Sequence, residues 1–206
     1  MNLPFLVFVM REFRHLIKPH LNQKQIADDL WLGSPGDMER AAAVLFPFYF
    51  KSGEPWVLLT QRNAQLKHHS GQVSFPGGGY EVQDKNIRHT ALRETFEEIG
   101  VPKNQVELWG ALDGLPSISG FHVTPFVGAI ADVSHLKIDK NEVDRAFGVP
   151  FAFFQDRNNR VKNKVKTPLG DRHYYVFEYK GDVIWGLTAQ IIVQLVNRLD
   201  NQSYDR

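Results

Sequence analysis

The sequence predicts an α/β protein built on a mixed β-sheet sandwiched between helices. Two observations predict this class. Short apolar stretches bounded by turn residues recur along the chain, as is typical of strands, and they outnumber the segments with helical periodicity. The helical segments interrupt the strands, so a sheet covered by helices on both faces is the economical arrangement. The 206 residues, 43% of them hydrophobic, suffice for one sizeable core.

Residues 1–37 are predicted to form a helical lead-in, and residues 38–206 the main domain. Leu3–Met10 is apolar, but it lacks a basic lead-in and a cleavage site, and it is too short to cross a bilayer. We therefore expect a helix docked on the domain and not a signal peptide. This helix could cap the core, join a homodimer or be disordered. A short helix is also expected at Gln23–Trp31. The apolar side of the first helix would carry Phe5, Val9, Phe13, Leu16 and Ile17.

Two strands and a glycine loop are the first elements expected in the main domain. Ala41–Phe50 and Trp56–Thr60 are almost continuously apolar and flank a short turn segment, which predicts a hairpin buried on both faces. A short strand at Val73–Phe75 then leads into Pro76–Gly79. Consecutive glycines let the backbone come close to another group.

A helix is predicted at Asn86–Ile99, ending at Gly100. A second amphipathic helix is expected at Thr188–Leu199. The inward side of the first helix would carry Ile87, Ala91, Leu92, Thr95, Phe96 and Ile99. Further strands are expected at Val106–Leu112, Val123–Ala131 and Arg172–Tyr179.

The overall composition argues against nucleic-acid and membrane partners. The 24 lysines and arginines nearly balance the 23 aspartates and glutamates, so any attraction for phosphates must be local. The chain has no cysteine, which excludes disulfides, thiolate metal sites and a cysteine nucleophile. A reducing compartment suits such a sequence, and we expect a cytoplasmic protein.

Three glutamates on the helix after the glycine loop are the main candidates for chemistry. Glu94, Glu97 and Glu98 are spaced i, i+3 and i+4, so a helix brings their carboxylates to one side. Because like charges at this spacing repel, a cation is expected among them, and Mg2+ or Mn2+ suits oxygen ligands. Arg93 can pair with one carboxylate. A solvated acidic face is the alternative, but the adjacent glycine loop, which can approach an oxyanion, favours a site.

The same residues resemble the signature box of the Nudix hydrolases. The usual pattern has an acidic residue eight positions before the arginine, where this chain has Lys85. We interpret this as a one-residue insertion, with Asp84 or Glu81 in the acidic role. The matching residues are Gly78, Asp84, Arg93, Glu94, Glu97, Glu98, Gly100 and Val101.

A second block, Leu58–Arg62 and Leu66–Gly78, resembles the coenzyme A-type Nudix pyrophosphatases, a subfamily that often carries the extra residue. Two positions depart from it: Asn63 replaces the usual serine or alanine, and Lys67 replaces an arginine, which keeps the charge but loses bidentate geometry. The likeness covers about residues 40 to 199. It also includes Thr124–Gly128, Glu142-Val143 and Trp185–Ala189.

The resemblance implies a Nudix fold and hydrolysis of a small-molecule nucleotide, with coenzyme A or acyl-coenzyme A split into 3',5'-ADP and (acyl-)4'-phosphopantetheine. Another diphosphate substrate, such as ADP-ribose or NADH, is the alternative, as is a non-catalytic nucleotide-binding sensor. Metals held by Glu94, Glu97 and Glu98 would bridge phosphate oxygens and lower the pKa of an attacking water. Glu142 could supply an extra carboxylate or the general base, or be one more surface acid.

A basic stretch before the glycine loop is suited to extra phosphates, such as the 3'-phosphate of coenzyme A. Arg62 and Lys67 are the expected phosphate contacts, with a solvated loop as the alternative. His68 and His69 are expected to be loop or substrate contacts, because oxygen-rich Mg2+ sites rarely need histidine. Finally, Gly77 and Gly78 would shape the loop under the metals, and residues 117–121 could line the substrate mouth.

Overall fold

The computed structural model describes residues 3–24, 40–66, 69–167 and 170–200. Most of the helix predicted at Gln23–Trp31 lies outside these residues, as do Lys67 and His68. Among the helices in the described ranges, none is long and apolar enough to cross a membrane.

The predicted hairpin is present. β1 (Ala41–Lys51) and β2 (Glu54–Arg62) pair antiparallel. The turn residues Ser52 and Gly53 have positive φ angles of 54° and 86°, which match the twist of strands joined by a two-residue loop. β1 is buried along nearly its whole length, as its continuous apolarity predicts.

β1 lies at the centre of a mixed eight-stranded sheet. The other strands of this sheet are β3 (Val73–Ser74), β4 (Gly77–Gly79), β5 (Val106–Ala111), β6 (Leu115–Pro116), β7 (His122–Ile130) and β8 (Val143–Pro150). The main path runs β3-β2-β1-β7-β5, with β4 paired to β1, β6 to β7 and β8 to β2. The β1–β7 pair is parallel and the β1–β2 pair antiparallel, so the sheet is mixed, as predicted.

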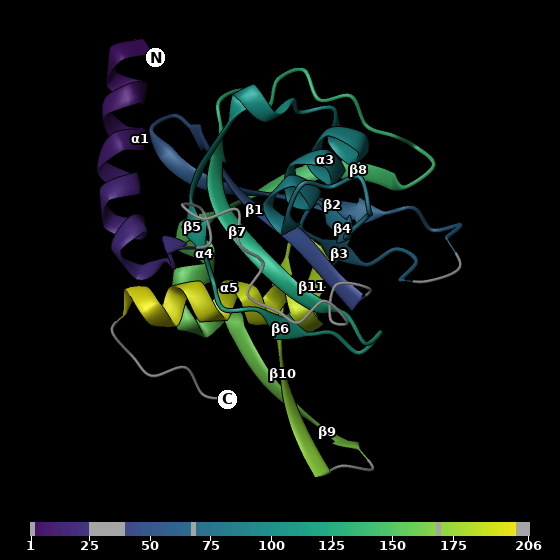
Figure 1. Cartoon of the computed structure of the whole chain (residues 1–206). Helices are drawn as coiled ribbons and strands as arrows, with labels where there is room; N and C mark the ends of the chain where they lie inside the picture. The colour runs from purple at the N-terminus through teal and green to yellow at the C-terminus, as the bar shows by residue number, and fades with distance from the viewer. Residues whose placement is uncertain (1–2, 25–39, 67–68, 168–169, 201–206) are drawn as a thin grey trace.

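Helices cover both faces of this sheet. Successive side chains of β1 point to opposite faces. Leu45 therefore packs in one core with α3 (Ile87–Ile99), while Phe46 packs in a second core with α5 (Gly186–Leu199). Figure 1 shows α3 above the sheet and α5 below it. The predicted sandwich is confirmed.

The amino-terminal helix α1 (Leu3–Ile17) packs against the core that contains α5. The ring of Phe13 meets Phe48 edge-on, with centroids 4.9 Å apart, and Ile17 is fully buried. Leu16 was predicted to share this apolar side, but it is 56% exposed. That part of the prediction is wrong because Phe13 and Ile17, four residues apart, already fill the contact face.

A second sheet, which the sequence did not predict, packs on α5. It contains β9 (Arg160–Thr167), β10 (Gly170–Tyr179) and β11 (Asp182–Trp185) in the order β11-β10-β9. Only the strand at Arg172–Tyr179 was expected. Phe177 of β10 is buried in the α5 core, whereas the β9–β10 hairpin extends away from the body of the protein (Figure 1).

The remaining predicted elements appear close to their expected ranges: β5, β7 and α5 correspond to two predicted strands and the last predicted helix. A short helix, α4 (Phe151–Gln155), was not predicted. Three 3-10 helices complete the described elements: η1 (Lys18–His20), η3 (Lys103–Gln105) and η4 (Arg157–Asn159).

Candidate active site

α3 carries the glutamate cluster, and local signals set both of its ends. Asn86 caps the first turn by accepting a hydrogen bond from the backbone N–H of His89 at 2.9 Å. Gly100 ends the helix in the left-handed conformation, with φ 72°. Phe96 was predicted to face the core, but it is 56% exposed, whereas Glu98 is only 1% exposed. The inward side of α3 therefore includes a carboxylate.

The glycine loop lies directly beneath α3. β4 pairs with β1, and a Cβ added at Gly77 would lie 2.3 Å from the carbonyl oxygen of Ala43. A Cβ added at Gly78 would lie 2.5 Å from the carboxylate carbon of Glu94. Gly77 therefore requires glycine because a side chain there would meet backbone atoms, whereas the absence of a side chain at Gly78 lets the Glu94 carboxylate rest against the strand backbone.

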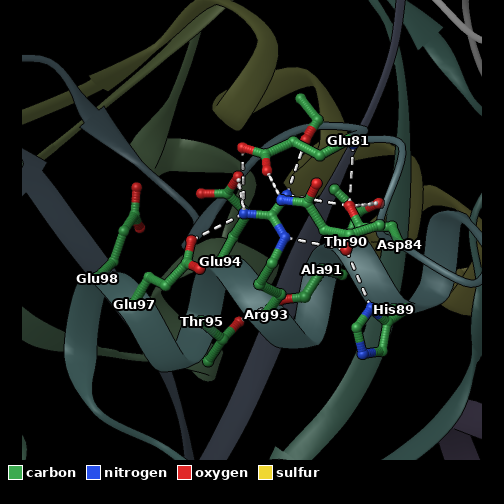
Figure 2. Close-up of polar contacts among 12 residues, drawn as sticks. Glu81, Asp84, His89, Thr90, Ala91, Arg93, Glu94, Thr95, Glu97 and Glu98 are labelled. Carbon is green, nitrogen blue, oxygen red and sulfur yellow. Dashed lines mark hydrogen bonds and ion pairs between the residues drawn. The ribbon is translucent and has the colours of Figure 1, made fainter.

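Arg93 bonds to the carboxylates of Asp84, Glu94 and Glu97, as Figure 2 shows. Its side chain is 12% exposed. The guanidinium donates to both oxygens of Asp84, at 2.9 and 3.0 Å. It also donates to Glu94 at 2.9 Å, to Glu97 at 2.8 Å and to the carbonyl of Gly79 at 3.0 Å. The planar, five-donor guanidinium suits this arrangement.

Asp84 is the buried acid that anchors Arg93. It also accepts hydrogen bonds from the Thr90 hydroxyl at 2.9 Å and from the backbone N–H of Glu81 at 3.1 Å, and it lies 2.9 Å from Nδ1 of His89. Burial by itself would raise the pKa of Asp84, but the hydrogen bonds, chiefly from Arg93, hold that pKa well below its usual range. The Glu81 carboxylate lies 3.8 Å from Arg93 and is half exposed.

Glu142 comes from the loop before β8 to join two glutamates of α3. Carboxylate oxygens of Glu94, Glu98 and Glu142 lie within 4.8 Å of one another. Burial, together with repulsion from Glu94 and Glu142, raises the pKa of Glu98 to about 8, against the lowering effect of Arg62. Burial also raises the pKa of Glu94. Despite the nearby arginines, Glu98 therefore retains a proton at neutral pH when no cation is bound.

Arg62 and Glu97 lie at different edges of the cluster. Nη1 of Arg62 is 3.4 Å from Oε1 of Glu98, and its side chain is 26% exposed. Glu97 is 51% exposed and hydrogen bonds to Arg93 on the outer side of α3. The structure thus brings Arg62, Glu98 and Glu142 together and keeps Glu97 at the periphery.

Comparison with known proteins decides the family. The NUDIX domain model matches residues 38–167, more than half of the chain. The chain belongs to the Nudix family. It is 40% identical over 171 residues to the Nudix hydrolase NudL of Pectobacterium atrosepticum, covering 82% of this chain and 87% of that protein. It is 39% identical over 163 residues to NudL of Photorhabdus laumondii, covering 79% and 87%. The solved NUDIX domain of Shewanella oneidensis NrtR, complexed with ADP ribose, is 20% identical with a TM-score of 0.43, covering 59% of this chain and 80% of that chain.

As a Nudix hydrolase, the protein acts on a nucleoside diphosphate derivative, and Nudix hydrolases generally use divalent ions such as Mg2+ or Mn2+. The cluster fits such an ion. Its ligands are carboxylate oxygens, which hard divalent cations prefer. Moreover, Oε2 of Glu98 is buried and has no hydrogen-bond partner among the described residues, a costly state that a cation would relieve.

Two other predicted contacts of this Nudix hydrolase can be placed. His69 is exposed, and its Nδ1 lies 3.0 Å from the side-chain oxygen of Gln72. Phe121, at the end of the segment predicted to line the mouth, is 37% exposed and would lie 3.7 Å from a Cβ at Gly79. This segment therefore reaches the glycine loop, whereas His69 belongs to a turn.

The sequence alone did not reveal the residues that hold Asp84 and the loop carrying Glu142 in place. Thr90 and His89 hold the anchor Asp84, and Asn63 and Asp144 bond to the segments around the Glu142 loop. A threonine or histidine one turn into a helix carries no signal of such a role. The contacts of Asn63 join segments far apart in the sequence, which spacing alone does not reveal.

Proposed function

We propose that this Nudix hydrolase splits coenzyme A or acyl-coenzyme A into 3',5'-ADP and 4'-phosphopantetheine or its acyl derivative. The observation that carries the chemistry is the approach of three carboxylates within 4.8 Å of one another beside the glycine loop. The support for the substrate is the block Leu58–Arg62 and Leu66–Gly78, which resembles the coenzyme A-type pyrophosphatases. A cytoplasmic location forms part of the proposal, supported by the absence of cysteine.

Mg2+ or Mn2+ would be held by Glu94 and Glu98, with Glu142 completing the cluster. Glu97 would add its carboxylate at the outer side, where Arg93 orients it. The bound cation supplies positive charge to the diphosphate and lowers the pKa of an attacking water.

The protein's own side chains perform the remaining steps. Arg93 fixes the rotamers of Glu94 and Glu97, so their oxygens are in place before substrate arrives. Glu142 is exposed and lies beside the buried Glu98, which suits it to accept the proton of the attacking water as general base.

Substrate phosphates would be bound beside Glu98. Arg62 is partly exposed beside Glu98, so its guanidinium can donate to a phosphate oxygen while remaining near the carboxylate. Lys67 would contact the 3'-phosphate as a point charge. Gly77 and Gly78 would shape the loop under the cations, because the missing side chains let β1 and the Glu94 carboxylate lie against the loop backbone.

The experiment that tests this proposal is a substrate panel with products identified by mass. Coenzyme A, acetyl-coenzyme A, dephospho-coenzyme A, ADP-ribose and NADH are offered separately with Mg2+ or Mn2+. We expect 3',5'-ADP from coenzyme A at a higher kcat/KM than any product from the other classes. Preferential cleavage of ADP-ribose or NADH would retain the chemistry but reject the coenzyme A assignment.

A non-catalytic sensor, the other alternative that the sequence offered, is disfavoured. Such a module would bind nucleotides without turnover on the whole panel. The presence of Arg93, Glu94, Glu97 and Glu98 argues against it, because a binding module has no need of a complete metal-ligating box.

A further inference from the structure

A β-bulge lies where β2 meets β8, beside the carboxylate cluster. Gln61 is opposite Arg145, but Arg62 is opposite Val143, so Asp144 is an extra residue on β8. Bulges bend a strand and change the direction of neighbouring side chains, and they are frequent next to active sites. This bulge separates Arg62, which reaches Glu98, from the regular part of the sheet.

Asn63, the residue directly after β2, hydrogen bonds to the loop that carries Glu142. Its backbone N–H donates to the carbonyl of Glu142 at 2.9 Å. Its side-chain amide donates to the carbonyl of Lys140 at 2.5 Å, while its side-chain oxygen accepts from the backbone N–H of Gln65 at 2.7 Å. One residue therefore contacts the loop on both sides of Asn141.

Further bonds hold the flanks of this loop. The Asp144 carboxylate accepts from the backbone N–H of Ala64 at 3.1 Å. On the other flank, the backbone N–H of Asp139 donates to the carbonyl of Glu98 at 3.0 Å. The segment that bears Glu142 is thus tied to α3 at its start and to the residues after β2 at its end.

The Glu142 side chain is exposed, so its position in the cluster depends on its backbone. An exposed carboxylate surrounded by Glu94 and Glu98 is repelled by them and would turn toward solvent if the loop moved. Ordering an exposed glutamate also costs side-chain entropy, and a fixed backbone reduces the number of conformations to be lost.

We infer that Asn63 is a positioning residue that holds the Glu142 loop and thereby keeps the Glu142 carboxylate in the metal cluster. The inference rests on the proposed metal site but not on the identity of the substrate. It also gives a role to a residue that departs from the coenzyme A-type block.

The test is Mn2+ binding to the full chain, without substrate, measured by electron paramagnetic resonance. Asn63→Asp keeps the acceptor for Gln65 and removes the donor to Lys140. We expect it to weaken Mn2+ binding about 10-fold, the usual lower range for residues that orient metal ligands. The added negative charge would by itself favour the cation, so weakening reports a change of geometry. Asn159→Asp makes the same change at an amide that donates to the Phe153 carbonyl at 2.9 Å, and it should bind Mn2+ as wild type does.

A double-mutant cycle separates positioning from general damage. In a Glu142→Gln background, Asn63→Asp should cause no further loss, because the carboxylate that Asn63 positions is already gone. Equal losses in both backgrounds, or wild-type binding by Asn63→Asp, would overturn the inference. If Asn63→Asp unfolds in EDTA, Asp144→Ala breaks the second tether and must show the same dependence on Glu142.

The outcome also separates this inference from the proposed function. A chain that does not cleave coenzyme A, but whose Mn2+ binding depends on Asn63 through Glu142, refutes the substrate and supports the inference. A wild-type chain that binds no Mn2+ refutes both.

Discussion

Replacing Glu98 by glutamine removes a buried carboxylate whose ionisation destabilises the metal-free fold. Burial raises the pKa of Glu98 from 4.5 to about 8. Between these values the folded chain binds a proton that the unfolded chain has lost, so the free energy of unfolding falls as pH rises, by up to about 1.4 kcal/mol per pH unit. The stabilisation by the retained proton is complete below the pKa of Glu98 in the unfolded chain, and it is lost once pH exceeds the pKa of Glu98 in the folded chain.

Wild type without metal should therefore lose stability relative to Glu98→Gln between about pH 5.5 and about pH 8. The expected difference is roughly 3 kcal/mol over that interval, because glutamine has no proton to release. Urea unfolding in EDTA, followed by circular dichroism at both pH values, measures it. Glu54→Gln makes the same chemical change at an exposed position and should parallel wild type.

Adding Mg2+ at the higher pH should make wild type more stable than Glu98→Gln. The cation binds ionised Glu98 and stabilises wild type, whereas Glu98→Gln gains little. If wild type and Glu98→Gln show the same pH dependence in EDTA, the carboxylate does not bear the burial cost, and the argument for a cation there fails.

Three further substitutions test other parts of the site. Gly78→Ala places a Cβ 2.5 Å from the carboxylate carbon of Glu94. Because this displaces the carboxylate, we expect kcat to fall about 100-fold in steady-state hydrolysis. An unchanged kcat would show that Glu94 need not rest on the loop. Arg93→Lys leaves the buried Asp84 without its bidentate partner. We expect the free energy of unfolding, measured by urea denaturation, to fall by about 3 kcal/mol. A decrease within the error of the fit would contradict this anchoring role. Lys67→Ala should raise KM for coenzyme A more than for dephospho-coenzyme A, whereas equal effects would mean that Lys67 does not contact the 3'-phosphate.

Elements with strong local signals could be predicted from the sequence. The hairpin of β1 and β2 follows from two apolar stretches around a turn containing Gly53, and α3 follows from Asn86 and Gly100 at its ends. The three box glutamates were recognised because their spacing is local to one helix. These features depend on neighbours in the sequence, so tertiary packing did not alter them.

The features that the sequence did not reveal depend on packing between distant segments. β9 places Lys162, Lys164 and Lys166 at alternate positions, so it lacks the apolar stretch that predicts a strand. Phe96 looked like a core residue, but the face of α3 that meets the sheet instead buries Glu98. Such a buried acid is tolerable only beside compensating charge, which the helical pattern alone does not show.

The most direct test of the metal-cluster mechanism is hydrolysis of coenzyme A by wild type and Glu98→Gln at saturating Mg2+, with 3',5'-ADP measured by mass. We predict that wild type forms this product, that Glu54→Gln does so at the same rate, and that Glu98→Gln falls at least about 100-fold because one ligand of the cation is lost. Wild-type turnover by Glu98→Gln would contradict the mechanism.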